Sequence, residues 1–305
     1  MKNLKTRGLA LAVVIALAGA GCGDDNDDIV LPPIGGYNSS NDVASTNLKA
    51  YWSFDGTLNE SKSSAAPTQS LRTSFVTGIK GQAVRLDSGF ILYPTIAALN
   101  AQTPGSLSIS TWINTQNQGA GTRPTGVVAY TLGATATTDW NVGPMILTLE
   151  NGRPTTYNDT LVLKTNITTY KAGTRLQGDN LNDFGVRGTD FKTVAGANKW
   201  VHMVGRYDGV GSFIDIYANG VRVSNNNFRF REAGGVGFGP MALPAGAQTQ
   251  VLIGGYPNSS NGFPNSAVQG FHGLFRGNID QVRIYDKALT DDEILALYQL
   301  ELAGR

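Results

Sequence analysis

The chain has 305 residues, a formal net charge of +1 and only 15% charged residues. This near-neutral charge argues against a nucleic-acid partner, because no basic field is present to attract phosphates. A single cysteine excludes an internal disulfide framework. The length suffices for one large domain or two small ones, and the 38 glycines, with abundant threonine, serine and asparagine, favour strands and turns over helical bundles.

The first segment has the order of a secretory signal peptide. Basic residues near the start precede an apolar run over residues 9–18, which is too short to be a comfortable membrane span. Small residues then lead to Cys22 and resemble a lipobox, in which the cysteine becomes the lipidated first residue of the mature chain. Gly19 stands where leucine is commonest in that pattern. We therefore expect a signal peptide over residues 1–21 and a lipid on Cys22; the alternative is an ordinary signal peptide.

Residues 22–46 are acidic at first and then rich in proline, glycine, serine and asparagine. They show no apolar periodicity, so we expect a flexible linker and a folded domain over residues 47–305. The aspartates that follow Cys22 have two interpretations. They are a solvated acidic tether, or they resemble the surface-export signals of lipoproteins in certain Gram-negative bacteria. The second interpretation predicts a lipid-anchored protein exposed on the bacterial outer membrane.

Strand signals follow one another from residue 48 onward. In residues 106–114 Leu107, Ile109 and Ile113 share one face, and Trp112 lies on the other. Asn219 and Gly220 supply the two positive-φ positions of a tight hairpin turn. The predicted strands cover residues 48–54, 81–87, 106–114, 126–132, 144–149, 160–164, 198–208, 213–218, 221–224, 251–255 and 279–285.

A short helix closes the chain. Thr290 followed by Glu293 is a capping box, in which each side chain binds a free backbone donor of the first turn. An apolar stripe follows on one helical face and gives the helix a surface with which to dock on the sheet. The stripe consists of Ile294, Leu297 and Tyr298.

Six of these segments together resemble, in order, the laminin-G-like domains of the concanavalin A-like lectin/glucanase superfamily. They include the Tyr-Trp-Ser-Phe-Asp-Gly string at residues 51–56, the strand at 106–114 and the C-terminal stretch at 271–298. The resemblance implies an all-β jelly-roll β-sandwich with a short C-terminal helix. The connections at residues 165–197 and 225–249 are longer than is usual in that family, and long loops in compact domains are often functional.

Asp280 is the first candidate site residue. Strict alternation places it on the same face as Val282 and Ile284, which are expected in the core, so its carboxylate needs a partner. The resemblance implies a structural calcium between the first and last strands, which would recruit Asp55 as well, and oxygen ligands suit that ion. The alternative is that backbone N–H groups or Arg276 satisfy Asp280.

No catalytic motif is evident. A glycosidase on this fold would need two facing carboxylates, and glutamate is so rare that no pair shares a strand face. No nucleophile elbow or phosphate loop is present either. We therefore expect a protein without enzymatic activity, with a glycan hydrolase or lyase as an alternative.

Aromatic residues in the predicted loops suggest non-catalytic glycan binding. A ring can stack on a sugar while neighbouring amides fix its hydroxyls. The candidates are Trp140, Tyr157, Asn158, Tyr256, Asn258 and Phe263. The alternative is that such residues only cover the ends of the sandwich. Tryptophans in predicted strands are assigned to the core, namely Trp52, Trp112 and Trp200. A module that binds an envelope protein through its long loops is the alternative function.

Overall fold

The computed structural model describes residues 31–117, 123–150, 159–182 and 190–305. The chain divides into two units, Met1–Pro32 and Pro33–Arg305, and the second unit contains the fold described below. Within the described residues, no helix is long and apolar enough to cross a membrane.

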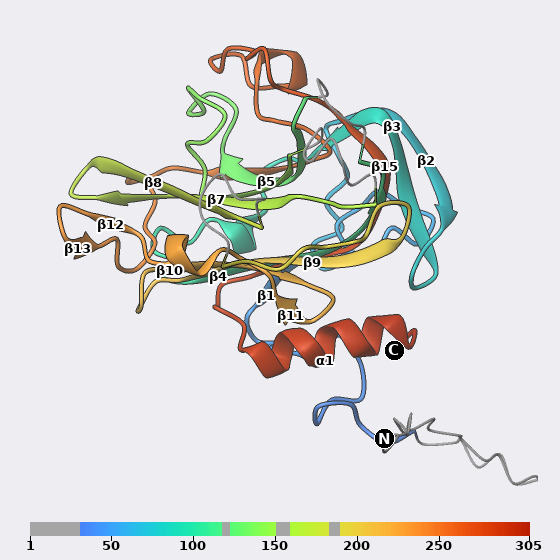
Figure 1. Ribbon diagram of the computed structural model, residues 1–305. Coiled ribbons are helices and arrows are strands. Elements are labelled where there is room, and N and C mark those ends of the chain that lie inside the picture. Colours follow the sequence, from blue (N-terminus) through green and yellow to red (C-terminus); the bar gives the residue numbers. More distant parts are fainter. Residues whose placement is uncertain (1–30, 118–122, 151–158, 183–189) are drawn as a thin grey trace, which may run out of the picture. The chain divides into compact units, whose positions relative to one another are not determined.

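The fold is built from antiparallel strands in one curled sheet (Figure 1). The strand order is β11-β10-β9-β4-β15-β3-β14-β5-β6-β7-β8, with β1 paired to β15 and β2 paired to β3. A small separate hairpin holds β12 and β13. The strands are β1 (Leu48–Trp52), β2 (Gln69–Thr77), β3 (Gln82–Leu92), β4 (Leu107–Thr115), β5 (Thr125–Leu132), β6 (Met145–Leu149), β7 (Leu163–Lys171), β8 (Thr174–Leu181), β9 (Trp200–Asp208), β10 (Phe213–Ala218), β11 (Val221–Arg222), β12 (Glu232–Ala233), β13 (Val236–Gly237), β14 (Thr249–Ile253) and β15 (Phe275–Tyr285). The helices are α1 (Asp291–Leu302) and the 3-10 turns η1 (Ala97–Leu99), η2 (Asn226–Phe228) and η3 (Ser259–Asn261).

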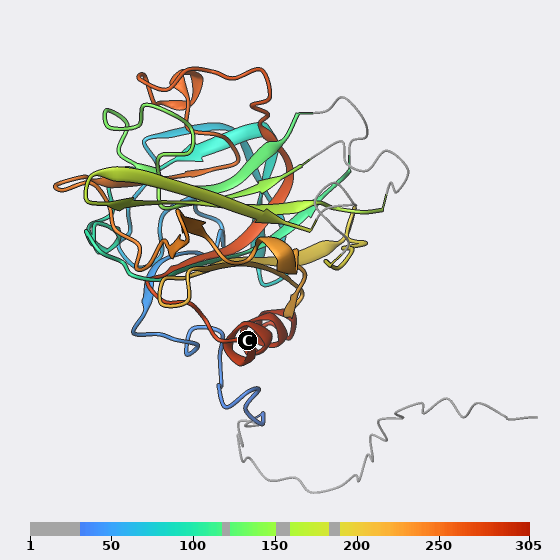
Figure 2. The same cartoon turned by 60° about the vertical axis from the view of Figure 1, so that its left-hand side comes forward.

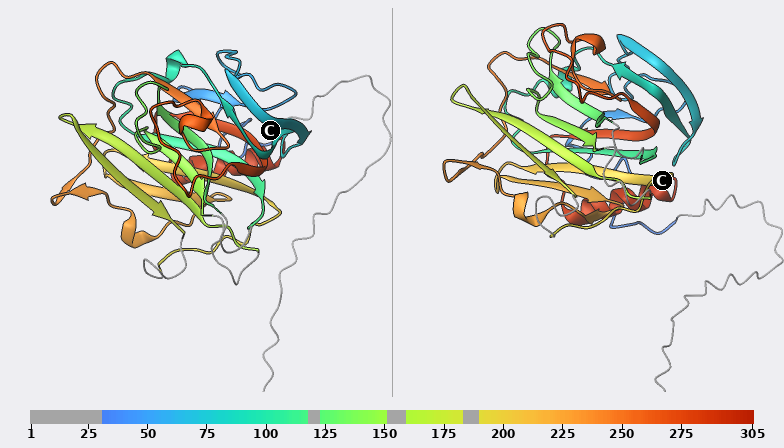
Figure 3. Two further views of the ribbon diagram at one scale, coloured as in Figure 1. Left: turned by 90° about the horizontal axis from the view of Figure 1, so that it is seen from above. Right: turned by 45° about the horizontal axis from the view of Figure 1, so that its top comes forward.

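The sheet folds over to form two layers (Figure 3). We call β10, β9, β4, β15 and β1 the helix-side layer, and β14, β5, β6, β7 and β8 the loop-side layer; β3 pairs with both. The layers pack closely at Gly205 of β9, where an added Cβ would lie 2.3 Å from Leu147 Cδ2 of β6. The core between them contains Ile109 and Ile113 from β4, as predicted. The expected all-β sandwich with a C-terminal helix is confirmed.

Helix α1 covers the outer face of the helix-side layer (Figure 2). The predicted capping box is present: Glu293 N donates to Thr290 Oγ1 at 3.1 Å, and Thr290 N donates to Glu293 Oε2 at 2.8 Å. Of the predicted stripe, Ile294 and Leu297 are buried, and Tyr298 stacks on Trp112 with 5.5 Å between the ring centroids. The apolar stripe therefore docks on the sheet as the pattern indicates.

The folded unit begins at Pro33, so the linker predicted to reach residue 46 is too long. Val43 is buried in the cluster beneath α1. Ser40 N donates to the Arg305 carbonyl oxygen at 3.2 Å, and Arg283 Nη1 donates to Asn41 Oδ1 at 2.8 Å. The segment has no periodicity of its own because its order comes from these polar contacts and from the burial of Val43, both of which involve distant parts of the chain.

A β-bulge in β15 overturns the predicted face of Asp280. Asp280 pairs with Trp112, and the next pair is Arg283 with Ser110, so one extra residue is accommodated around Gln281, whose φ is +49°. The bulge shifts the alternation by one residue. Val282 therefore lies in the core, while Asp280 lies on the outer face beside Trp112.

Candidate functional site

The residues predicted to bind a glycan differ in burial, and some of them lie outside the described residues. Tyr157 and Asn158 lie outside the described residues, as does Cys22. Tyr256 and Phe263 are buried, so neither ring can serve as an open platform for a sugar, and these two predictions are wrong. They are buried because the loops that carry them fold over the outer face of the loop-side layer, where Phe263 packs against Leu252 of β14.

Asn258 is also buried and has a structural role. Its side chain accepts a hydrogen bond from Ser260 N at 3.0 Å and so caps the 3-10 turn η3. Its Nδ2 atom contacts His272 Nδ1 at 3.0 Å, and Gln269 N donates to the same ring nitrogen at 3.3 Å. Burial lowers the pKa of His272 to about 4, so this ring is neutral at pH 7. The side chain of Asn258 thus joins two parts of the β14–β15 connection, and it is not a free contact group.

Trp140 remains as a half-exposed aromatic candidate. Its indole meets Tyr256 edge to face with the centroids 5.4 Å apart, and it meets Phe271 in the same way at 5.7 Å. Tyr256 in turn stacks on His272 with the centroids 4.6 Å apart. Such edge-to-face and stacked contacts are favourable and fix ring orientation. Trp140 is therefore held rigidly with part of its surface accessible.

A polar groove of about 280 Å³ adjoins Trp140. Strands β7 and β8 supply its floor, because Asn166 pairs with Asp179 and Thr168 pairs with Gln177, while Ile167 between them points into the core. We call this site the Trp140 groove. The side chains used below are Trp140, Asn141, Lys164, Asn166, Thr168, Gln177 and Asp179.

Two contacts fix the tryptophan loop to this floor. Thr168 Oγ1 donates to the Asn141 carbonyl oxygen at 2.5 Å, and Gln177 Nε2 donates to the same oxygen at 3.3 Å. The ammonium of Lys164 lies 3.2 Å from Glu150 and 3.0 Å from Asp179, so its charge is compensated within the groove. The site is thus rigid, polar and without an uncompensated cation.

Two buried polar atoms of the groove residues have no hydrogen-bond partner among the described residues. They are Asn166 Nδ2, a donor, and Asn141 Oδ1, an acceptor. An unsatisfied buried polar atom costs about 1–3 kcal/mol, so such atoms usually have a bound partner. Both atoms are closed to solvent, so a polyhydroxylated ligand beside Trp140 would pair with them only if the two amide side chains turned toward the groove.

Sequence reasoning missed Asn166, Thr168 and Gln177. They lie in a stretch that was expected to be largely a long connection, whereas the structure forms the β7–β8 hairpin there. The alternation of Asn166, Thr168 and Tyr170 against Ile167 was the available signal. It is weak because the outward face of β7 is polar.

The contacts of Asp280 and Asp55 do not fit a calcium site. Ile79 N and Lys80 N donate to Asp280 Oδ2 at 2.9 and 3.3 Å, and Gln82 N donates to Asp55 Oδ1 at 2.7 Å. Calcium requires six to eight oxygen ligands, whereas N–H donors surround Asp280 here. Within the described part of the chain, no group of three or more His, Cys, Asp or Glu side chains could hold a metal ion. The contacts instead match the alternative of backbone N–H donors.

Burial has a further effect on Asp280. Burial raises the pKa of this carboxyl to about 7. The hydrogen bonds from Ile79, Lys80 and Gln281 favour the charged form and lower the pKa, but their effect is smaller than that of burial. Arg276, the other partner considered, forms an ion pair with Asp87 instead.

The comparisons with known proteins place this fold. A search of curated protein sequences finds no match. Among solved structures, the chain is similar to domain 4 of AbnA, an extracellular arabinanase from Geobacillus stearothermophilus solved with arabinotriose, at 18% identity and a TM-score of 0.48, covering 83% of this chain and 98% of that domain. It is also similar to the binding domain of Paraclostridial Mosquitocidal Protein 1, at 14% identity and a TM-score of 0.50, covering 84% of this chain and 52% of that one.

A third similar structure is the binding domain of botulinum neurotoxin DC in complex with SialylT, at 13% identity and a TM-score of 0.50, covering 86% of this chain and 52% of that one. The chain thus spans about half the length of the two toxin domains. At these identities the likeness to the two toxin domains establishes the fold alone. A laminin-G-type family model, described as the concanavalin A-like lectin/glucanases superfamily, matches residues 91–295. The chain therefore belongs to the laminin-G-like family of the concanavalin A-like lectin/glucanase superfamily.

Proposed function

We propose that this chain is a non-catalytic glycan-binding module and that the Trp140 groove is its binding surface. The observation that carries the proposal is the rigid, half-exposed indole in a groove lined by the half-buried side chains of Asn141 and Asn166, each of which has one buried polar atom without a partner. The toxin binding domains of similar fold are consistent with a binding role.

In this proposal the C–H face of a sugar ring packs on the Trp140 indole. When the two buried amides turn toward the groove, one hydroxyl accepts from Asn166 Nδ2 and another donates to Asn141 Oδ1, which would satisfy both atoms. The compensated charge of Lys164 favours a neutral sugar. The volume of about 280 Å³ lies at the lower end of ligand pockets, so the groove would hold a short part of a glycan chain.

The sequence adds a location to this proposal. A lipid on Cys22 would tether the module to the bacterial outer membrane, with the domain exposed at the cell surface. Two acyl chains, each contributing about 0.8 kcal/mol per buried CH₂, would make that attachment stable. Polysaccharide at the cell surface would then be within reach of the Trp140 groove.

The test is a glycan array probed with the full chain in detergent, followed by calorimetric titration of the best ligand. Trp140→Ala and Asn166→Ala should each lower affinity tenfold or more, because central aromatic and buried polar contacts typically dominate binding. Asn227→Ala, an exposed asparagine in the 3-10 turn η2, is the matched control and should have no effect.

Three outcomes would contradict the proposal. Binding that survives Trp140→Ala would place the ligand elsewhere on the domain. No glycan binding, together with specific capture of one envelope protein, would favour the protein-binding alternative. Release of sugar products from a polysaccharide would show a hydrolase or lyase.

A further inference from the structure

We propose a second ligand site, for an anionic glycan, on the outer face of the helix-side layer. It rests on the proposed function for the general class of ligand, but it uses different residues on the opposite layer. The site is a row of side chains across four neighbouring strands. In order these are Arg85 of β3, Asn278 of β15, Asn114 of β4 and Trp200 of β9.

Strand register places these four residues on one face. Arg85 pairs with Asn278, Asn278 with Asn114, and Asn114 with Trp200. Directly opposite residues of antiparallel strands point to the same side. The next row along the strands, Val84, Ile279, Ile113 and Val201, lies in the core, so the Arg85 row points outward. With strands roughly 4.8 Å apart, the row is about 14 Å long.

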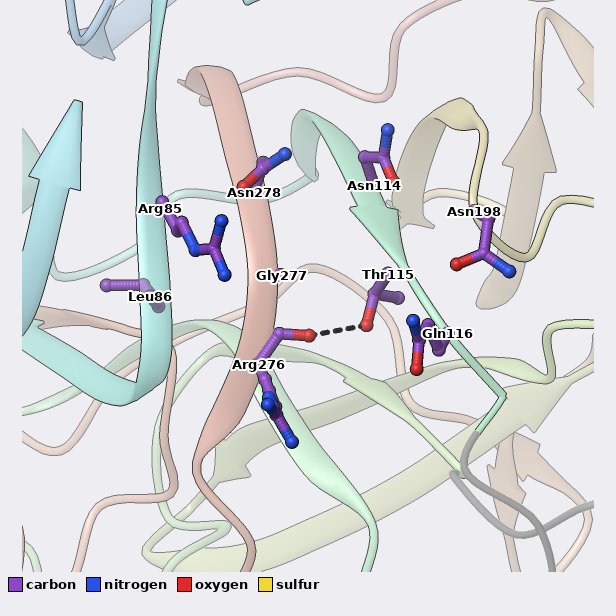
Figure 4. Close-up of a pocket in the computed structure, with 9 residues that line it drawn as sticks. All are labelled: Arg85, Leu86, Asn114, Thr115, Gln116, Asn198, Arg276, Gly277 and Asn278. Atoms are coloured by element: carbon purple, nitrogen blue, oxygen red, sulfur yellow. Dashed lines mark hydrogen bonds between the residues drawn. The ribbon is translucent and has the colours of Figure 1, made fainter. Parts of the chain in front are cut away.

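A hollow adjoins three residues of the row, Arg85, Asn278 and Asn114, and does not reach Trp200 (Figure 4). The hollow has a volume of about 250 Å³. The side chains that matter here are Arg85, Asn114, Gln116, Asn198, Arg276 and Asn278. Gly277 lies among them with a φ of +150°, and an added Cβ would lie 2.4 Å from the Asn114 carbonyl oxygen. Strand β15 therefore passes β4 more closely here than a residue with a side chain would allow.

The hydrogen-bonding groups of the hollow are unused. Among the described residues, no side-chain hydrogen bond involves the amides of Asn114, Gln116, Asn198 or Asn278, and no carboxylate pairs with Arg85. Arg276 has an ion pair with Asp87 at 3.3 Å, but both side chains are about two thirds exposed, and such pairs contribute little. Polar capacity is thus concentrated where no protein partner uses it.

The neighbouring row shows the contrast. Two residues further along the strands, Trp112 Nε1 donates to Glu301 of α1 at 2.7 Å, and His202 Nε2 contacts Ser110 Oγ at 2.7 Å. That row is buried, and Trp112 Nε1 and His202 Nε2 both have protein partners. Trp52 and Trp112 are buried as expected, whereas Trp200, also expected in the core, is half exposed because the Arg85 row is not covered in this way.

The chemistry of the row selects its ligand. A guanidinium binds a carboxylate through two parallel hydrogen bonds, amide groups bind hydroxyls, and an indole offers an apolar face. Two arginines at one end and a tryptophan at the other therefore fit an extended sugar chain that carries carboxylates, namely a polyuronate. The Trp140 groove, whose lysine is compensated, lacks this preference.

The experiment is calorimetric titration of the full chain in detergent with an oligogalacturonate. The same oligosaccharide after reduction of its carboxyl groups, and a sulfated neutral oligosaccharide of equal length, serve as comparison probes. We expect the oligogalacturonate to bind at least tenfold more tightly than its reduced form. Arg85→Gln and Trp200→Ala should each weaken its binding at least tenfold. Arg72→Gln on the exposed β2 strand makes the same change in net charge and should alter affinity less than twofold.

The outcomes distinguish this site from the Trp140 groove. Equal losses for Arg85→Gln and Arg72→Gln would show nonspecific charge attraction and overturn the site. Loss of oligogalacturonate binding in Trp140→Ala instead would place that ligand in the groove, which overturns the second site and leaves the proposed function standing. Tighter binding of the sulfated probe would overturn the assignment to a carboxylate. Thermal melts of each variant check that the fold is retained.

Discussion

A buried ion pair joins α1 to the sheet, and Glu301→Gln tests its importance. Arg283 Nε donates to Glu301 Oε1 at 2.8 Å, and both side chains are fully buried. Trp112 Nε1 donates to the other carboxylate oxygen at 2.7 Å. The guanidinium also lies 3.9 Å from the Tyr51 ring and donates to Asn41 of the N-terminal segment. Arg283 of β15 therefore contacts α1, β1 and the N-terminal segment.

Glu301→Gln keeps the shape and a hydrogen-bond acceptor for Trp112, but it removes the negative charge. The Arg283 guanidinium then stays buried with only neutral acceptors such as Asn41 and Ser40. Removing one partner of a buried pair costs about 3–5 kcal/mol. In a domain of roughly this size each kcal/mol lowers the melting temperature by about 2–4 °C, so we expect a decrease of about 6–20 °C.

The assay is equilibrium denaturation with a thermal melt. Glu232→Gln, an exposed glutamate in β12, is the matched control and should change stability by less than about 0.5 kcal/mol. Replacing both partners with Arg283→Met and Glu301→Leu should recover most of the loss, because the desolvation of two charges offsets their attraction. A loss below about 1 kcal/mol in Glu301→Gln, or a double variant as unstable as the single one, would refute the reasoning.

Further predictions concern the helix, the pH dependence, calcium and the anchor. Leu297→Ala should lower the free energy of unfolding by about 2–5 kcal/mol because the side chain is fully buried. Leu302 in the same helix is 53% exposed, so Leu302→Ala should lower it by less than about 0.5 kcal/mol. Equal losses in denaturant titrations would contradict docking through Leu297. Because burial raises the pKa of Asp280 to about 7 from 3.8, its contribution to stability is present near pH 4 and is lost as the pH rises through 7. The stability difference between the wild type and Asp280→Asn should therefore change with pH, by up to about 1.4 kcal/mol per pH unit in this window, and a constant difference would be inconsistent with the raised pKa. Because backbone N–H donors occupy the carboxylates of Asp55 and Asp280, we expect chelator to leave the melting temperature unchanged. A loss close to the roughly 2.7 kcal/mol that calcium would add at a hundredfold excess over Kd would contradict this interpretation. Cys22→Ser should release the chain from membranes and abolish lipid labelling; unchanged fractionation and labelling would exclude Cys22 as the anchor.

Local signals in the sequence predicted much of this fold. The alternation over residues 106–114 placed Ile109 and Ile113 in the core, where the structure has them. Asn219 and Gly220 have φ values of +50° and +78°, as the hairpin signal required. The capping box at Thr290 is formed as predicted. Each of these features depends on residues close together in the chain, so its pattern is visible without knowledge of the fold.

The candidate sites were decided by contacts between distant residues. The face of Asp280 depends on a bulge at Gln281, and a one-residue bulge reverses every assignment made by alternation. The burial of Tyr256 and the exposure of Trp200 depend on which loops and helices cover each face, which the two residues' own neighbours in sequence do not determine. The sequence by itself determined most of the core strands, the hairpin turn and the helix through local periodicity, but not β2 or the β7–β8 hairpin. Only the tertiary structure decided which polar and aromatic side chains are paired and which face solvent, because that depends on partners such as Asn41 and Arg283, which meet only when the sheet closes.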